Sequence, residues 1–349
     1  MNAMSFNETG GHRRSMHDIS RAELRAAVAP FETPSLWLGV YQIATSIGLY
    51  IALLALMYWS LHISYALTLL LAIPASALLV RVFIVQHDCG HGSFSGWKRG
   101  NDILGAICGL LTLAPYAHWR RQHANHHSNW NNLDRRESGS DIYSACLTVA
   151  EYRALSPWQR FLYRLPRHPL IAHVILPPLV FLALYRTPFD TPKDWTRERR
   201  SVWTTNLAIL VCFLALGFTL GFRAVLMVQL PVVVLTTIVG VWLFSVQHRF
   251  EDACWLRKGE WNFVAAALEG SSYLVLPRAL HWVTGNIGYH HIHHLSQRVP
   301  NYRLAACHGS SALLRPAKPL SLWQALDAGN LTLWDEGSNR LVRFRDAAV

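Results

Sequence analysis

Charged side chains are scarce in this 349-residue chain: Asp, Glu, Lys and Arg make up 15% of it, and 52% of the residues are hydrophobic. Charges are almost absent from four long runs, at residues 36–60, 63–86, 201–221 and 224–247. Because a helix rises about 1.5 Å per residue, each run can cross a hydrocarbon core of about 30 Å. These runs exclude the two or three soluble domains that the length alone would permit. We predict an all-α integral membrane protein with four transmembrane helices.

The four runs form two pairs with very short connections, so each pair predicts a helical hairpin that crosses the membrane and returns. Two other apolar stretches, 103–117 and 170–185, are too short or too interrupted by proline to span comfortably, and we expect interfacial helices there. The predicted parts are an N-terminal arm at 1–34, a membrane domain at 35–305 and a C-terminal tail at 306–349.

Paired cysteines are also lacking, since the six cysteines are scattered without a Cys-x-x-Cys motif, and no structural disulfides are expected. Arginines gather in the arm, in residues 98–200 and after residue 249, while the hairpin tips are nearly bare of them. The positive-inside bias therefore places these parts in the cytoplasm, against a cell or inner membrane. The net charge of +11 fits a face near anionic lipid or a docking surface for an acidic electron carrier. No nucleic-acid partner is predicted.

Histidine, by contrast, is abundant and clustered. Nine of the eighteen histidines lie in three five-residue clusters, His87–His91, His123–His127 and His290–His294. Offsets of three and four residues put histidines on one face of a helix. The histidines that share a face in this way are His87 and His91; His123, His126 and His127; and His290, His293 and His294. All three clusters are predicted on the cytoplasmic side of the spans, where they can converge on a metal, for which neutral imidazole is a common ligand.

A ninth candidate ligand, His248, ends the fourth apolar run much as His87 follows the second. Nine imidazoles are more than one ion can use, so we predict two metal ions. Zinc prefers four ligands, and calcium and magnesium prefer oxygen. Iron accepts imidazole and leaves positions open for dioxygen. Two irons also supply electrons in pairs, which suits splitting an O–O bond beside an unreactive C–H bond.

The clusters His-Asp-Cys-Gly-His, His-Ala-Asn-His-His and His-His-Ile-His-His, flanked by paired spans, resemble the membrane-bound fatty acid desaturases from about residue 36 to 305. The flanking residues 86–94 and 284–289 add to the resemblance. It implies a di-iron site that removes two vicinal hydrogens from an acyl chain of a membrane lipid, leaving a cis double bond. It also implies dioxygen as oxidant and two electrons from an external donor. The implied metal ligands are His87, His91, His123, His126, His127, His248, His290, His293 and His294.

Two details narrow the resemblance. Front-end desaturases usually carry Gln at the start of the third cluster, where this chain has His290. His168-Pro169 is followed by Leu-Ile rather than the Gly-Gly of a cytochrome b5 haem loop. We therefore expect no fused cytochrome b5 and a separate electron donor such as a ferredoxin. The chain is most similar to bacterial acyl-lipid desaturases of the delta-12 or omega type.

Residues beside the clusters are expected to orient the ligands, because metal-bound imidazole usually donates its other N–H to an acceptor. The candidates for this outer layer are Asp88, Asp141, Glu251, Glu269 and Asn286. Candidates for the lining of an acyl channel are Trp119, Trp282 and Tyr289. His118 and His281 lie near the clusters and His291 lies within the third, but none of the three is expected to be a ligand.

Two other functions stay open at this point. An acyl hydroxylase, an alkane hydroxylase or a carotenoid-modifying oxygenase shares the first hydrogen abstraction with a desaturase. A metal transporter or sensor is less compatible with the sequence, because transporters place ionisable ligands near the bilayer midplane. The spans of this chain are free of such residues at their centres.

Overall fold

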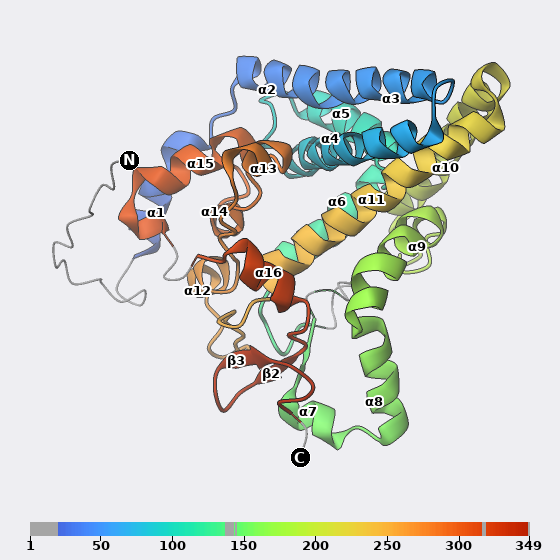
Figure 1. Cartoon of the computed structure of the whole chain (residues 1–349). Helices are drawn as coiled ribbons and strands as arrows, with labels where there is room; N and C mark the ends of the chain where they lie inside the picture. The colour runs from blue at the N-terminus through green and yellow to red at the C-terminus, as the bar shows by residue number, and fades with distance from the viewer. Residues whose placement is uncertain (1–19, 137–142, 144, 316–318, 348–349) are drawn as a thin grey trace, which may run out of the picture.

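The computed structural model describes residues 20–136, 143, 145–315 and 319–347, and helices dominate these residues (Figure 1). Four helices are long and apolar enough to cross a membrane: Leu36–Ser60, Tyr65–His91, Thr196–Leu220 and Phe222–His248. They confirm the four predicted transmembrane helices and the helical fold class.

The long helices form two hairpins. The first pairs a helix made of α2 (Leu36–Ile43), the π-helical turn η3 (Ala44–Gly48) and α3 (Leu49–Ser60) with α4 (Tyr65–His91). The second pairs α10 (Thr196–Leu220) with α11 (Phe222–His248). Both hairpin tips lie at the right-hand side of Figure 1, and α4 and α11 run from the tips back into the body of the protein.

Helices α4 and α11 are longer than a membrane requires. Each has 27 residues, or about 40 Å, against a hydrocarbon core of about 30 Å. The prediction that the second span continues as one helix to His87 and His91 is confirmed. The helix stops there because Gly92 adopts φ 73°, a left-handed conformation that glycine takes most readily.

Short elements connect the hairpins. In order they are α5 (Lys98–Leu111), α6 (Tyr116–Asn129), β1 (Leu147–Thr148), α7 (Val149–Ala154), α8 (Pro157–Arg164), η4 (Leu165–Arg167), η5 (Ile171–Ile175), α9 (Leu176–Leu182) and η6 (Leu184–Arg186). The expected helix at 103–117 is divided between α5 and α6. Leu113 takes φ 58° between them, and Pro115 precedes the first residue of α6.

The remaining elements are α1 (Arg21–Val28) and η2 (Ala29–Phe31) before the first span, and α12 (Phe263–Leu268), α13 (Arg278–Val283), α14 (His290–Leu295), α15 (Asn301–Ser310), η7 (Ala312–Leu314), α16 (Leu322–Ala328), β2 (Leu333–Asp335) and β3 (Arg340–Val342) after the last. Leu24 and Val28 of α1 share a buried core with Leu304 of α15. The residue 305 boundary predicted from the sequence falls inside α15.

The small sheet was not expected from the sequence. Strand β2 pairs antiparallel with β3 and parallel with β1, so the C-terminal hairpin is joined to the middle of the chain. Strands of two or three residues are too short to show the alternation that would reveal them. Leu333 and Tyr152 are buried together in a small core behind this sheet.

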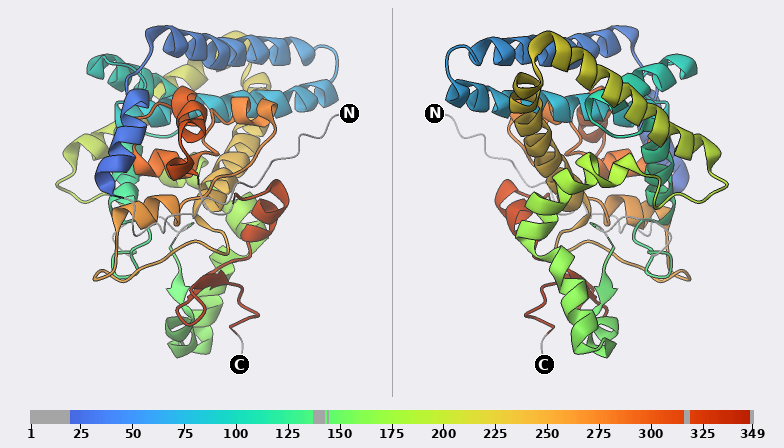
Figure 2. Two further views of the ribbon diagram at one scale, coloured as in Figure 1. Left: turned by 90° about the vertical axis from the view of Figure 1, so that its left-hand side faces the viewer. Right: turned by 90° about the vertical axis from the view of Figure 1, so that its right-hand side faces the viewer.

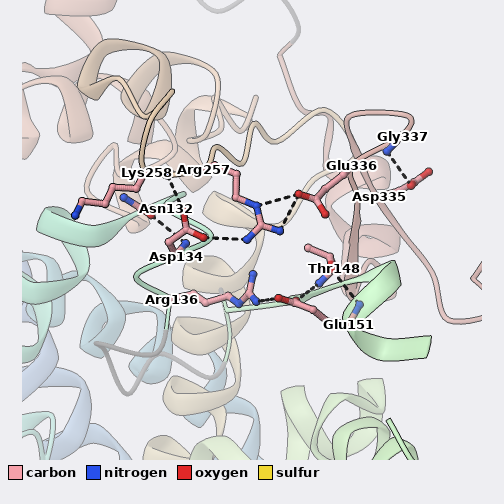
Figure 3. Close-up of polar contacts among 10 residues, drawn as sticks. All are labelled: Asn132, Asp134, Arg136, Thr148, Glu151, Arg257, Lys258, Asp335, Glu336 and Gly337. Atoms are coloured by element: carbon pink, nitrogen blue, oxygen red, sulfur yellow. Dashed lines mark hydrogen bonds and ion pairs between the residues drawn. The ribbon is translucent and has the colours of Figure 1, made fainter. Parts of the chain in front are cut away.

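A polar junction holds the loop after α6 to the C-terminal hairpin (Figure 3). Arg257 donates to Asp134 at 2.9 Å and to Glu336 at 2.9 and 3.0 Å. The backbone N–H of Lys258 also donates to Asp134, and this hydrogen bond and the guanidinium of Arg257 lower the pKa of the Asp134 carboxyl. The junction lies at the surface, so it fixes the position of these loops more than it stabilises the fold.

Candidate metal centre

Imidazoles from four helices meet at the inner ends of the two hairpins. Helix α4 brings two of them, α6 three, the last residue of α11 one, and α14 three. In each of two groups, every histidine offers one ring nitrogen, and these nitrogens all lie within 4.8 Å of one another. The larger group is His87, His91, His123, His127 and His293, and the smaller is His126, His248 and His294.

The two groups touch each other. The Nε2 atoms of His126 and His248 are 3.0 Å apart, and His290 Nε2 lies 3.0 Å from His248 Nε2. His127 belongs to the larger group, and its ring centre is 4.2 Å from that of His294 in the smaller group. All nine histidines singled out in the sequence therefore lie in one continuous cluster.

Burial favours the neutral form of several of these rings. It lowers the pKa of His123, His127, His290, His293 and His294 well below the ordinary histidine value, and the neighbouring imidazoles lower it further. A neutral imidazole has a free nitrogen lone pair, which is the form that binds a metal. Facing Nε2 atoms at 3.0 Å can share only one proton or one ion, so the arrangement suits metal ions better than a self-contained hydrogen-bond network.

Asp88 orients the first of these rings. Its Oδ1 lies 3.0 Å from Nδ1 of His87, while the buried Nε2 of His87 has no hydrogen-bond partner. Asp88 Oδ2 accepts from both the backbone N–H and the side-chain amide of Asn301, at 2.6 and 2.7 Å. Asn301 is in turn paired with Gln42 through both side-chain amides, at 2.9 and 3.2 Å. Asp88 thus binds one ring nitrogen of His87 and leaves the other, Nε2, available to a metal. This is the contact expected of a residue that orients a metal ligand.

Sequence reasoning missed Asn301 and Gln42. Gln42 is 1% exposed within the first span. A buried polar residue in an apolar span is unusual enough to indicate a functional contact, so this signal was present. Asn301 gives no comparable signal in the sequence, because an asparagine after Pro300 is also common where a helix begins.

The other outer-layer candidates lie elsewhere or outside the described residues. Glu251 is exposed and pairs with Arg340 at 3.3 Å. Glu269 is also exposed. The side chain of Asn286 donates to the backbone carbonyl of Asn301 at 3.2 Å, so it reaches the support of Asp88 rather than a ring. Asp141 lies outside the described residues.

Aromatic residues cover the cluster on two sides. Trp119 stacks on His123 with ring centres 4.8 Å apart. Trp130, which the sequence did not single out, lies 3.8 Å from His248 between ring centres. Of the other two channel candidates, Trp282 lies under the guanidinium of Arg81, and Tyr289 is stacked between other rings.

The nearby histidines that were not expected to be ligands have other partners. His291 Nε2 lies 3.0 Å from the carbonyl of Leu314. His281 stacks on Tyr289. His118, in α6, lies 2.9 Å from Asp190 in the loop before α10.

The contact between His118 and Asp190 anchors the helix that carries the second histidine cluster. Burial alone would raise the pKa of Asp190, but the hydrogen bond and charge of His118 outweigh it and lower the pKa. Gln122 donates to the same carboxyl at 3.2 Å. We expect Asp190→Ala to reduce the free energy of unfolding by about 1–3 kcal/mol at pH 7, because the buried ring of His118 loses its hydrogen-bond partner.

The pH dependence follows from the sign of this shift. A carboxyl with a lowered folded-state pKa stabilises the fold above its ordinary pKa of about 4, and the contribution is lost as the pH falls through the folded value. The difference in thermal stability between wild type and Asp190→Ala should therefore be present at pH 7 and shrink below pH 4. An equal difference at both pH values would contradict the assignment.

The donor set fits a transition-metal centre. Both groups consist of imidazoles alone, with no carboxylate or thiolate of the described residues among them. Imidazole suits iron, copper, nickel and zinc, whereas calcium and magnesium need oxygen. The arrangement can hold two adjacent ions with nitrogen ligands, at the point where two membrane hairpins end.

Comparison with known proteins agrees with this geometry. The profile of the fatty acid desaturase family matches residues 60–324. A fatty acid desaturase of Bacillus subtilis (strain 168) is 42% identical over 93% of this chain and 90% of its own length.

Plant relatives are more distant. A temperature-sensitive sn-2 acyl-lipid omega-3 desaturase (ferredoxin) of Arabidopsis thaliana chloroplasts is 28% identical, over 64% of this chain and 51% of its own length. An acyl-lipid omega-3 desaturase (cytochrome b5) of the endoplasmic reticulum of the same plant is 30% identical, over 64% of this chain and 58% of its own length. Together with the helical hairpins and the histidine cluster, these matches establish that the chain belongs to the fatty acid desaturase family, whose members are membrane-bound oxidoreductases.

Proposed function

We propose that the nine clustered histidines hold two iron ions and that the chain desaturates the acyl chains of membrane lipids. The observation that supports this most is the meeting of all nine imidazoles in two adjoining groups. When bound, such an iron pair supplies the oxidising power that an unactivated C–H bond requires. In the overall reaction, dioxygen takes two hydrogens from the acyl chain, two electrons and two protons, and yields the double bond and two waters.

The protein's own residues would bind the ions, orient one of the ligands and contact the substrate. We assign His87, His91, His123, His127 and His293 to one ion. The smaller group of His126, His248 and His294, joined by the adjacent His290, is assigned to the other. Asp88 fixes the ring of His87 with Nε2 free to bind. Trp119, stacked on His123, is the residue that we propose to line the path of the acyl chain to the cluster. Iron, rather than another imidazole-binding metal, is inferred from the family.

The electron donor is proposed to be a separate protein. The names of the plant relatives indicate both ferredoxin and cytochrome b5 as donors within the family. The net charge of +11 favours an acidic carrier such as a ferredoxin. The excess of arginine in the parts of the chain around the cluster supports a cytoplasmic position for it.

Lipid analysis tests the reaction directly. The chain is expressed in a host that lacks polyunsaturated lipids, and the acyl chains are analysed by gas chromatography–mass spectrometry. We expect a new unsaturated acyl species with wild type and none above background with His126→Ala. A hydroxylated product without a new double bond would overturn the assignment in favour of a hydroxylase.

A further inference from the structure

Helix α8 exposes its apolar face, whereas a helix of a soluble domain buries that face. Trp158, Phe161, Leu162 and Leu165 follow the i, i+3, i+4, i+7 spacing of one helical face. Their exposed fractions are 65%, 49%, 48% and 44%, and no residue of α8 is buried. An amphipathic helix normally turns this face towards a core, so the apolar face of α8 is left uncovered by the residues that the structure describes.

The opposite, polar face of α8 is the one that packs on the protein. Tyr163 accepts from the backbone N–H of Leu147 in β1 and donates to the carbonyl of Thr332, at 2.9 and 3.1 Å. The guanidinium of Arg164 lies over the rings of Tyr152 and Phe344. These contacts bind α8 to the small sheet. The apolar face is therefore directed away from the sheet.

The exposed apolar surface continues beyond α8 towards the membrane spans. Leu170, Ile175, Leu179 and Leu182 of the next elements are 39–55% exposed. Helix α9 packs on α11, and the neighbouring span α10 exposes its own apolar residues along the same side. In Figure 1, α8 and α9 form the right-hand edge of the lower part of the molecule, on the side of the hairpin tips. In the right-hand view of Figure 2 they lie in front of the C-terminal strands.

This segment does not cross the bilayer, although its composition and length would permit a span with a bend of 48°. The second histidine cluster precedes it, and His248 and the third cluster follow it after the second hairpin. His126 lies 3.0 Å from His248 through their Nε2 atoms, so the chain must reach α10 on the side of the membrane where it left α6. One crossing between them would separate these rings by the thickness of the membrane.

We propose that residues 157–186 form a membrane foot, a bent amphipathic segment that lies along the leaflet next to the histidine cluster and inserts its apolar face into it. The partner is the lipid surface itself. The foot's apolar face continues the lipid-facing surface of the spans, which favours lipid over a second copy of the chain. The guanidinium groups of Arg160, Arg164 and Arg167 lie over protein rings on the other side of the helix, so the face offered to the lipid is apolar. Because α8 is bonded to the small sheet, the foot would also hold that sheet close to the membrane surface.

Site-specific labelling tests the foot in the full chain. A polarity-sensitive fluorophore is attached at Phe161→Cys, or at Leu165→Cys as a second position, in a background that lacks the accessible thiols of Cys212 and Cys254. The matched control is Lys258→Cys, an exposed position in the polar junction. Each protein is placed as a single copy in lipid nanodiscs of phosphatidylcholine and phosphatidylglycerol.

At both foot positions we expect quenching by doxyl-labelled lipid to exceed that at residue 258 by about threefold or more, and quenching by aqueous iodide to be reduced by a similar factor. Iodide access equal to that at residue 258 would show that the face lies in water and would overturn the proposal. Iodide protection that appears only when two copies share a particle would assign the face to self-association and would also overturn it.

Discussion

His293→Ala is expected to remove iron from the protein and to abolish desaturation, while the protein still inserts and folds. His293 is 1% exposed, and its Nε2 lies 3.0 Å from that of His127 in the five-histidine group. Loss of a residue that only orients a metal ligand costs about 10- to 100-fold in affinity or activity. Loss of a ligand itself should therefore exceed about 100-fold. Iron per polypeptide, measured by mass spectrometry, and double bonds formed per hour provide the two readouts.

The matched control is His291→Gln in the same short helix. His291 is fully buried, but its ring bonds to the carbonyl of Leu314 and to His308 instead of to the cluster. A glutamine amide can still donate to that carbonyl, so we expect iron content close to that of wild type. Equal iron loss in both variants would mean that disruption of α14, rather than loss of a ligand, is responsible. Normal iron content in His293→Ala would contradict its place among the ligands.

The contrast between His291 and His293 also shows which parts of the site the sequence could predict. Helical spacing separated the off-phase His291 from its neighbours, and the structure places it outside the cluster. The apolar runs predicted the spans to within a few residues, because hydrophobic length is a strong signal. His248 was found from its position at the end of a span.

Contacts between distant parts of the chain could not be predicted in this way. Nothing in the periodicity of residues 147–148 shows that they pair with residue 333, since the strands are too short. Glu251 was selected for its closeness to His248 in the sequence, yet in the structure its carboxylate pairs with Arg340. The support of Asp88 by Asn301 joins residues 213 positions apart. Such partners follow from packing and leave no local pattern.

Asn301→Asp is expected to weaken iron binding by about 10- to 100-fold by acting through Asp88. The side-chain amide of Asn301 donates to Asp88 Oδ2 at 2.7 Å, and Asp88 fixes the ring of His87. The substitution removes this donor and puts a second carboxyl against the first, so Asp88 is repelled from its position. Iron affinity is measured by titration of the apoprotein, with thermal unfolding of the apoprotein measured in parallel.

Two further variants separate orientation of the ligand from stability of the fold. Asn301→Ala removes the donor without adding charge, and Gln42→Leu removes only the partner of the Asn301 amide, so the loss of iron affinity should decrease in the order Asn301→Asp, Asn301→Ala, Gln42→Leu. If Asn301 served packing alone, iron affinity would follow the unfolding temperature of the apoprotein in all three. An orienting role predicts instead that Asn301→Asp loses more affinity than its loss of stability explains, because the repelled carboxylate turns His87 away from the cluster. Wild-type iron affinity in Asn301→Asp would show that the ring of His87 is held in place by something other than this chain of hydrogen bonds.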